Sequence, residues 1–313
     1  MIPSDGTDDQ ESLLGLQELE PSPVEDTPAE YGHDSYFPSA SSSSSPSPPP
    51  LQHRSSTLGL SGHGPIYYLT RIQKYSSYAF SVFTAFHITN TSLIPLLTKS
   101  IPASDTYLLL TRPYYQSPLA EPVIVVLPLL AHIGSGVALR LYRRSQNLQR
   151  YGAESKTDRR RVAWPALSGT SLLGYILAPL VIGHAFVNRV LPLWVDGGSS
   201  GIGLGYVSHG FARHPLFSNI GFAALVSVGV WHSVWGWAKW LNLAPAQVTD
   251  SGAEGQRKRK RRWYGVNLLS ATVAGLWLAG GLGVVGRAGE ARGWVGREYD
   301  ELYRRIPVFG RWA

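Results

Sequence analysis

Residues 127–144 read LPLLAHIGSGVALRLYRR, an apolar stretch with one histidine near its middle and a cluster of arginines at its end. An α-helix needs about 20 mostly apolar residues to cross the hydrocarbon core of a bilayer. Four other stretches of the chain have the same character. We therefore predict five membrane-spanning helices, at residues 75–98, 122–142, 166–188, 218–241 and 264–286.

These stretches are too long and too uniformly apolar to be strands of a transmembrane barrel. Because only helices and closed barrels satisfy their backbone groups inside a bilayer, the predicted fold is an all-α membrane protein built as a five-helix transmembrane bundle. Pro128 and Pro179 lie inside predicted spans and should kink them locally. Small residues in Gly134-Ser135-Gly136, and again between Gly275 and Gly286, favour close packing of helices.

Two further regions flank the predicted transmembrane domain at 65–286. Residues 1–64 are acidic and include the run SASSSSSPSPPP at 39–50, a composition that favours a disordered tail. Residues 287–313 are predicted to be a short amphipathic C-terminal segment, with a frayed tail as the alternative. Apolar residues recur there at steps of 4, 3 and 4, as in a helix lying on a membrane surface: Val295, Tyr299, Leu302 and Ile306.

Loop charge predicts how the bundle is oriented. The net charge is +7, but residues 1–74 carry ten acidic against three basic residues, so the remainder carries +14. The loop at 140–162 has eight basic and two acidic residues, and that at 239–262 has seven and two; the other two loops are nearly neutral. By the positive-inside rule the basic loops face the cytosol. With five spans, the N-terminal tail shares that side and the C-terminus lies across the membrane.

Two motifs have simpler explanations than their first appearance suggests. RKRKRR at 257–262 resembles a nucleic-acid patch, but beside a membrane span it is better explained by topology and by attraction to anionic lipid headgroups. GIGLGYVSHG at 201–210 lacks the preceding strand of a dinucleotide site and is predicted to be a loop between spans. The absence of cysteine excludes disulfides and thiolate sites. The N-terminus resembles neither a signal peptide nor a mitochondrial transit peptide.

Four histidines, one in each of the first four spans, are the candidate cofactor ligands: His87, His132, His184 and His232. Ionisable groups inside a membrane are costly and usually face the bundle interior. At 1.5 Å per residue, His132 and His232 both lie about 11–12 Å from the cytosolic end of their spans. They could therefore ligate one haem b iron from opposite sides. His87 and His184 form the weaker pair, because their estimated depths differ by most of two helical turns.

Two alternatives to haem remain for the bundle. The histidines could form a buried polar network with Thr89, Asn90, Ser135 and Ser233. Alternatively, the polar residues of the spans, with Ser227 among them, could line a groove along which the bundle scrambles lipid. Neither a His-x-x-x-His motif nor a carboxylate is present in the spans, which argues against a hydrolytic metal site and a proton pump. The protein is expected not to be an enzyme.

The tail carries one candidate partner-binding motif. Leu14, Leu16 and Leu19 lead into Pro21-Ser22-Pro23, so leucine anchors precede an extended Pro-x-Pro segment that loses little entropy on docking. The alternative is that these are a few leucines in a tail without a binding role. A second Pro-x-Pro, at 46–48, has no leucines upstream.

Four stretches together resemble one known family: FHITNTSLIPLLT (86–98), LAHIGSGVALRLYRR (130–144), YVSHGFARHP (206–215) and WHSVWGWAKWL (231–241). They are similar to the fungal mitochondrial outer-membrane adaptor family, whose founding yeast member suppresses loss of the ER–mitochondria tether. The similarity covers about residues 66–286. The transmembrane domain of that family is in turn distantly similar to the cytochrome b membrane anchors of succinate dehydrogenase and fumarate reductase, which favours the haem interpretation.

The resemblance implies a function and a location. Members of the family recruit a bridge-like lipid-transfer protein to mitochondria through a Pro-x-Pro motif in the cytosolic tail, preceded by hydrophobic anchors. The positions here that match this pattern are Leu14, Leu16, Leu19, Pro21 and Pro23. The protein is thus expected to support mitochondrial lipid homeostasis from the outer membrane, with its C-terminus in the intermembrane space. Lipids, including anionic headgroups, are expected partners, and nucleic acid is not.

Overall fold

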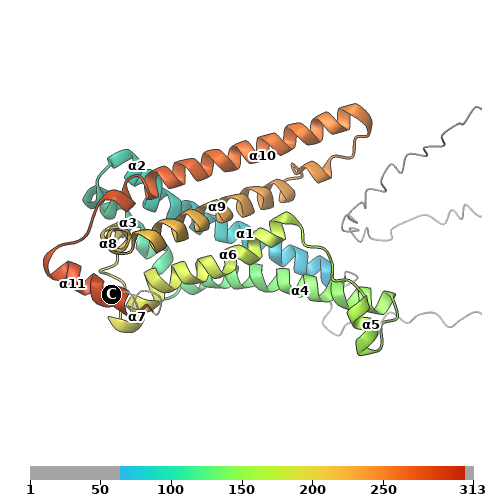
Figure 1. The fold of residues 1–313 in the computed structure, drawn as a ribbon, viewed down its shortest axis with the longest axis horizontal. Coiled ribbons are helices and arrows are strands. Elements are labelled where there is room, and N and C mark those ends of the chain that lie inside the picture. Colours follow the sequence, from blue (N-terminus) through green and yellow to red (C-terminus); the bar gives the residue numbers. More distant parts are fainter. Residues whose placement is uncertain (1–63, 307–313) are drawn as a thin grey trace, which may run out of the picture. The chain divides into compact units, whose positions relative to one another are not determined.

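The computed structural model describes residues 64–306, and within that range every regular element is helical. By packing, the chain divides into residues 1–68 and residues 69–313. The helix bundle belongs to the second unit (Figure 1). The sequence-based predictions for residues 1–64 lie outside the described residues, apart from Gly64.

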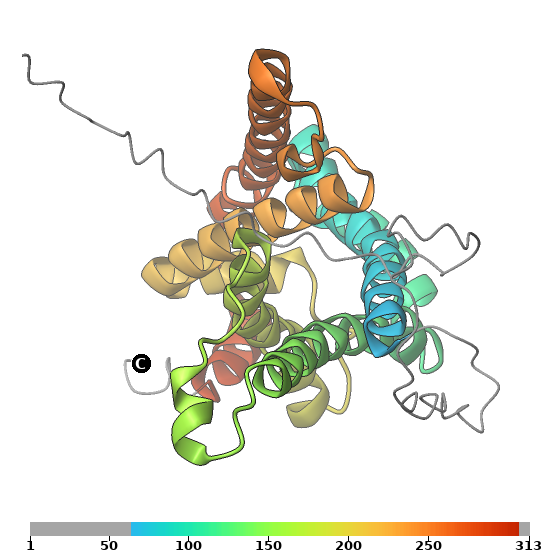
Figure 2. The ribbon, with the colours of Figure 1, turned by 90° about the vertical axis from the view of Figure 1, so that its right-hand side faces the viewer.

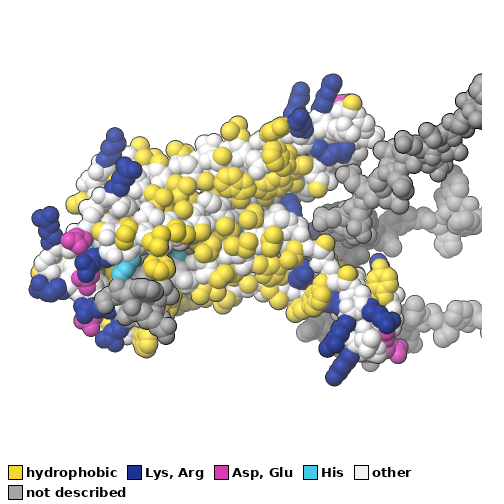
Figure 3. Space-filling model, in the orientation of Figure 1, with side chains coloured by type: hydrophobic (Ala, Val, Ile, Leu, Met, Phe, Trp, Pro, Cys, Tyr) yellow, Lys and Arg dark blue, Asp and Glu magenta, His cyan; other side chains and the backbone are white. Residues whose placement is uncertain are grey.

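Five helical segments are long and apolar enough to cross a membrane, which confirms the predicted all-α, five-span fold. The first is α1 (Pro65–Ile88), continued by η1 (Thr89–Leu93) and α2 (Ile94–Thr98). The second is η2 (Glu121–Val126) with α4 (Leu127–Arg150), and the third is α6 (Gly169–Ala185) with η3 (Phe186–Val190) and α7 (Leu191–Val195). The fourth is α9 (Pro215–Trp240) and the fifth is α10 (Gly252–Gly281). Hydrophobic side chains cover the middle of these helices, and lysines and arginines gather at their two ends (Figure 3).

Three spans change to a π-helical turn just before a proline. Pro95, Pro128 and Pro192 each lie in the first turn of the α-helical segment that follows η1, η2 and η3. A proline lacks an N–H and its ring crowds the carbonyl of the preceding turn, and one extra residue in that turn relieves the crowding. The predicted local kink at Pro128 therefore takes the form of a π turn, whereas Pro179 lies inside the α-helical segment α6.

Helix α9 lies between α6 and α10, which both pack along it (Figure 2). Val226 and Val230 on α9 and Ala274 on α10 form the buried core of that contact. Glycines allow the closest approaches. A Cβ at Gly280 on α10 would overlap the backbone of Ser92 in η1, whose hydroxyl donates to the carbonyl of Trp277 at 2.7 Å.

The structure corrects the prediction of a loop at 201–210. Residues Leu204–Arg213 form helix α8, in which Tyr206 and His209 are fully buried. A second helix not expected from the sequence, α3 (Ile101–Gln116), links the first two spans. Helices α3 and α8 are short and have polar faces. They therefore contain too few apolar residues to be recognised as membrane spans. Together with α2, α7 and α11 they lie at one end of the bundle (Figure 1).

Helix α11 (Gly293–Arg304) has the helical periodicity predicted for the C-terminal segment, but its apolar face contacts protein. Leu302, Tyr303 and Ile306 are buried in one cluster with Leu191 of α7 and Tyr206 of α8. The prediction of a helix lying on the membrane surface is therefore wrong for these residues. The sequence shows that such a face is apolar but cannot show whether lipid or protein covers it.

The basic run RKRKRR belongs to α10 and is not part of a loop. Arg259 and Arg262 donate to carbonyls of the preceding connection, at 3.1 Å to Val248 and 2.9 Å to Asn242. Helix α10 thus extends three turns beyond the predicted fifth span at the end that carries the basic loops (Figure 1).

Candidate functional site

The structure brings His132 of α4 and His232 of α9 together inside the bundle. Their ring centroids lie 6.0 Å apart, with the ring planes at 81°. Nδ1 of His132 lies 3.1 Å from the carbonyl oxygen of Gln73 on α1, and Nδ1 of His232 lies 2.9 Å from that of Thr170 on α6. A carbonyl oxygen only accepts, so both Nδ1 atoms carry the proton and donate it. Both Nε2 atoms are then left with a lone pair available to a metal.

Two glycines provide the space for this arrangement. A Cβ at Gly174 on α6 would lie 2.8 Å from Cε1 of His232, and a Cβ at Gly136 on α4 would lie 2.9 Å from Nε2 of Gln73. Neither position therefore accommodates a side chain without movement of the imidazole or of the glutamine. The close approach of α6 to His232 places the Thr170 carbonyl within hydrogen-bond distance.

His87 of α1 and His184 of α6 form a second pair, with ring centroids 5.8 Å apart and planes at 77°. The expectation that different depths would separate them is wrong. Helix α6 begins at Gly169, three residues after the start of the predicted span at 166–188, so His184 lies about 22 Å along it at 1.5 Å per residue. By the same rise His87 lies about 33 Å along α1, which begins at Pro65, so the pairing depends on how α1 and α6 cross and not on counted depth.

The two pairs differ in how their ring nitrogens are held. Nδ1 of His184 lies 3.4 Å from the side-chain nitrogen of Asn188, which also donates to the His184 carbonyl at 2.9 Å. In that contact Nδ1 accepts, so the proton sits on Nε2. His87 stacks on Phe83, with centroids 5.5 Å apart. Only the His132–His232 pair therefore shows the Nδ1–H···O=C bond that commonly orients a metal-ligating histidine.

The chemistry of the donor set indicates which cofactor would fit. Within residues 64–306, no three His, Asp or Glu side chains converge as a metal site. Two imidazoles alone do not complete the four ligands that zinc prefers. They would suit haem b, which brings most of the iron's ligands itself and would take the remaining ones from the protein. His132 and His232 would hold the iron, and haem as the cofactor stays a prediction.

The polar side chains of the spans do not form the network considered as an alternative. Ser135 donates to the backbone carbonyl of His132, and Asn90 donates to that of Phe86 in its own helix. Within the described residues, neither these two nor Thr89 and Ser233 hydrogen-bond a histidine ring. Asn90 and Ser135 are also buried, so these two do not line an exposed lipid groove.

An ion pair at the end opposite the basic loops was missed by the sequence analysis. Glu121 is the first residue of η2, one position before the predicted span, and its carboxylate accepts from both Nε and Nη2 of Arg189 in η3, the former at 2.7 Å. Nearby, Arg112 of α3 donates to the carbonyl of Ser199 at 3.1 Å. These contacts tie the second and third spans, and α3, to the connection before α8. One feature of the sequence indicated these contacts, the near-neutral net charge of the loops at this end of the bundle.

A second missed cluster joins α8 to α11. Nε2 of His209 lies 3.0 Å from Oδ1 of Asp300, and its Nδ1 accepts from the backbone N–H of Ala291 at 3.1 Å. Arg213 donates to the same carboxylate oxygen at 3.1 Å. Burial raises the pKa of Asp300, but the hydrogen bond from His209 and the charge of Arg213 outweigh it, so the pKa lies below its ordinary value.

Tyr303 completes the contact between α8 and α11. Its hydroxyl donates to the carbonyl of Tyr206 at 3.1 Å, and the two rings stack with centroids 4.7 Å apart. Burial raises the pKa of Tyr303 well above its ordinary value, so the hydroxyl keeps its proton. Gly210 leaves room for that hydroxyl, because a Cβ there would overlap it.

The predicted partner-binding residues fall outside the part of the chain that the structure describes, and two arginines of α4 have ordered contacts. Leu14, Leu16, Leu19, Pro21 and Pro23 lie outside the described residues. Arg140 stacks over the ring of Trp164 at 5.6 Å, close to the end of α4 that carries the basic loop. The neighbouring Arg144 is buried, and its guanidinium donates to the carbonyls of Val162 and Ala163 at 2.6 and 2.8 Å, and also to that of Arg159.

Five apolar helices, joined by charged connections and enclosing paired histidines, define a multi-pass α-helical membrane protein. Residues 179–290 match the family model of the transmembrane domain of MDM10-complementing protein 1. This match confirms the family resemblance predicted from the sequence for that part of the chain, which runs from the middle of α6 to just beyond α10. Neither a curated protein nor a solved structure matches the chain. The distant similarity to cytochrome b anchors therefore stays a prediction.

Proposed function

We propose that the chain is an outer-membrane adaptor of mitochondria, with no enzymatic activity of its own, whose N-terminal tail recruits a bridge-like lipid-transfer protein. The observation that carries the proposal is the match of residues 179–290 to the transmembrane domain of MDM10-complementing protein 1. Complementation of MDM10, as that name states, implies a mitochondrial role. The five-span bundle supplies the membrane anchor such an adaptor needs.

The orientation of the bundle is part of the same proposal. Five spans place the two chain ends on opposite sides of the membrane, and the basic connections after α4 and before α10 share a side with the tail. The tail, with Leu14, Leu16, Leu19, Pro21 and Pro23, would then face the cytosol. Protease treatment of intact mitochondria should remove the tail and spare an epitope after α11; the reverse pattern would overturn the orientation.

Recruitment is tested with the full-length protein in mitochondria. The Pro21→Ala/Pro23→Ala variant should recover much less of the lipid-transfer protein on immunoprecipitation, because the extended segment that docks is lost. The matched control is Pro46→Ala/Pro48→Ala, which alters the Pro-x-Pro without leucines upstream and should leave recovery unchanged. Equal recovery with wild type, Pro21→Ala/Pro23→Ala and the control would remove residues 14–23 as the binding site.

A second candidate function, electron transfer through a b-type haem, is favoured by the His132–His232 pair. Haem b, when bound, supplies an iron centre that takes up and releases one electron. The chain's own contribution would be two imidazoles whose Nδ1–H groups are fixed by the carbonyls of Gln73 and Thr170. This candidate is compatible with the adaptor, because the tail and the bundle are separate regions.

Absorbance spectroscopy tests the haem assignment. Protein purified after expression with sufficient haem should show a Soret band, and His132→Ala or His232→Ala should abolish it. The control is His184→Ala, which should leave the band in place because the proton on Nε2 of His184 disfavours ligation. A colourless wild-type protein would contradict the assignment, and a band lost only in the control would move the site to the other pair.

A further inference from the structure

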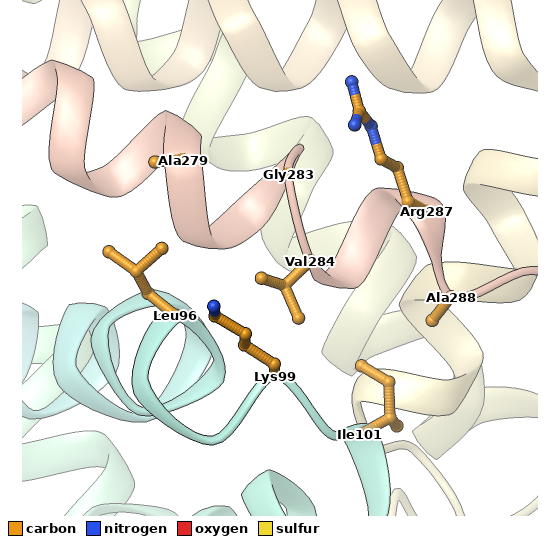
Figure 4. Close-up of a pocket in the computed structure, with 8 residues that line it drawn as sticks. All are labelled: Leu96, Lys99, Ile101, Ala279, Gly283, Val284, Arg287 and Ala288. Carbon is orange, nitrogen blue, oxygen red and sulfur yellow. The ribbon is translucent and has the colours of Figure 1, made fainter.

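A groove of about 430 Å³ opens where the first and fifth spans end, on the side opposite the basic loops. Leu96 of α2 and Ile101 of α3 form one wall, and Ala279 of α10 and Val284 form the other (Figure 4). Two cationic residues complete the lining. The ammonium end of Lys99 lies among the apolar side chains, while Arg287 extends outward at the rim (Figure 4).

Within the part of the chain that the structure describes, no acidic group neutralises the two cations of this groove. Within residues 64–306, neither the ammonium group of Lys99 nor the guanidinium group of Arg287 forms a hydrogen bond or an ion pair, and no carboxylate lines the groove. Elsewhere at this end of the bundle the chain does pair cations with acids, as Arg189 with Glu121 and Arg213 with Asp300 show. The groove therefore combines two unpaired positive charges with apolar walls.

The backbone conformation of Lys99 also supports a binding role for this groove. Lys99 ends α2 in the left-handed conformation, with φ of 52°, and its N–H donates to the carbonyl of Pro95 at 2.8 Å. Glycine or asparagine takes this conformation at lower cost, and for other residues it costs about 1 kcal/mol. The helix dipole favours a cation at this C-terminal end, but it does not account for a left-handed lysine where glycine would cost less. Lys99 is exposed, and a strained, exposed lysine that lines an apolar groove indicates a role in binding an anion.

The groove is continuous with the apolar surface of α10. Leu276, one turn before Ala279, is 48 % exposed, and Leu269, two turns further, is 54 % exposed. Leu97, beside the groove on α2, is 82 % exposed. In a bilayer these side chains face acyl chains, and the groove lies at the level where the spans end, which is the level of the headgroups. A ligand with an anionic head and acyl tails matches both parts of this surface.

We propose that this groove binds the headgroup of an anionic phospholipid in the leaflet opposite the basic loops. Lys99 contacts the phosphate from inside the groove, Arg287 approaches it from the rim, and the acyl chains follow α10 past Leu276. Basic pockets between transmembrane helices are known to hold such headgroups. The site goes beyond recruitment by the tail and does not depend on it, because it uses none of the residues before α2.

Native mass spectrometry of the detergent-purified full-length protein tests the site by titration with phosphatidylglycerol. Wild type should retain one phosphatidylglycerol more tightly than phosphatidylcholine. Lys99→Gly should lower the affinity about fivefold, the value of one basic residue near an anionic headgroup, and adding Arg287→Gln should lower it further. Lys99→Gly also relieves the left-handed strain, so its loss of lipid cannot be attributed to unfolding.

Matched controls separate the groove from general surface charge. Arg292→Gln/Arg297→Gln removes two exposed charges near α11 at the same end and should leave lipid retention unchanged. Ala279→Phe should block the groove without changing charge, while Ala271→Phe, on an exposed position two turns earlier in α10, should not. Losses as large in Arg292→Gln/Arg297→Gln or in Ala271→Phe as in Lys99→Gly would overturn the proposal, and so would unchanged lipid retention in Ala279→Phe.

Two further outcomes would also overturn it. Glycerol phosphate that displaces phosphatidylglycerol as effectively as a short-chain phosphatidylglycerol would show a site for soluble phosphate. Phosphatidylcholine retained as tightly as phosphatidylglycerol would show that the cations do not select the ligand. Recruitment by the tail does not require lipid in this groove. A negative result in the lipid titration would therefore leave the adaptor proposal standing.

Discussion

The two ends of the helix bundle hold their charged side chains in different ways. At the end that carries the basic loops, arginines donate to backbone carbonyls, as Arg144 does to Val162 and Ala163, and Arg262 to Asn242. At the other end, two arginines pair with carboxylates, in Arg189–Glu121 and Arg213–Asp300, and Arg112 donates to the Ser199 carbonyl.

The difference shows how a chain can order its loops and keep a charge imbalance at the same time. A carbonyl orders an arginine without neutralising it, so the first end retains its positive charge, on which the proposed orientation rests. A carboxylate both orders an arginine side chain and neutralises its charge. The loops at the second end are therefore nearly neutral although they contain several arginines. Counting loop charges predicts the imbalance, and only the structure shows how each end achieves it.

The largest effect is expected at Arg144. Arg144→Ala removes three donated hydrogen bonds from a buried guanidinium and should lower the opening free energy of residues 159–163 by about 3 kcal/mol. Hydrogen exchange of those amides measures it. Arg144→Lys should not restore protection, because an ammonium cannot reproduce the planar fork. Full protection of these amides in Arg144→Ala would show that the hydrogen bonds from Arg144 to backbone carbonyls do not stabilise residues 159–163.

A smaller effect is expected at the Glu121–Arg189 pair, whose side chains are 22 and 25 % exposed. Arg189→Gln should destabilise the bundle by about 2 kcal/mol, because Glu121 loses a bidentate partner in a partly dry site. The double variant with Glu121→Gln should cost less than the sum of the two single changes, measured as thermal unfolding in detergent. The control is Lys258→Gln at the opposite end, which breaks a half-exposed pair with Asp250 and should cause no measurable change.

Tyr303→Phe tests the docking of α11 on α8 and should lower its local opening free energy by about 1 kcal/mol, the value of one hydrogen bond. The apolar ring remains, so the effect stays modest. Tyr299→Phe, which removes an exposed hydrogen bond to the Gly201 carbonyl, should have a smaller effect. Equal effects of the two changes, read from hydrogen exchange of α11, would argue against a special role for the buried hydroxyl.

The smallest effect is the pH dependence that Asp300 contributes to the same docking. The folded-state pKa of Asp300 lies below its ordinary value of 3.8, so its contribution is present above that value and is lost as the pH falls through the lower folded pKa. The difference in α11 protection between wild type and Asp300→Asn should therefore be constant from pH 7 to pH 5 and vanish in more acidic solution. A difference that disappears between pH 7 and pH 5 would show that another group controls it.

Much of the fold follows from the sequence because a bilayer imposes strict rules. Runs of about 20 apolar residues have few stable arrangements in lipid, so all five spans are predicted, although α1 begins ten and α10 twelve residues before the predicted starts. The rules weaken outside the hydrocarbon core. Helix α8 contains buried Tyr206 and His209 beside polar residues, and this mixture has neither the length nor the hydropathy of a span. The same holds for α3.

The candidate site was predictable only in part. The sequence indicates that His132 and His232 lie at one depth, because that estimate needs only the helical rise and a nearby charged residue. The same estimate fails for His87 and His184, since it depends on where α1 and α6 begin, and both helices begin away from the predicted positions. The roles of Gln73 and Thr170 could not be foreseen, because their contribution is a backbone carbonyl that every residue possesses.

The sequence by itself determined that this protein crosses a membrane with five helices, which side carries the excess positive charge, and which histidines lie inside. These properties depend on transfer of side chains between water and lipid, which is nearly a sum over residues. The tertiary structure alone decided that the histidines pair across helices, that α11 docks on α8, and that Lys99 and Arg287 share one groove. Those contacts join residues far apart in the chain, and their geometry depends on how the helices cross, which no local pattern specifies.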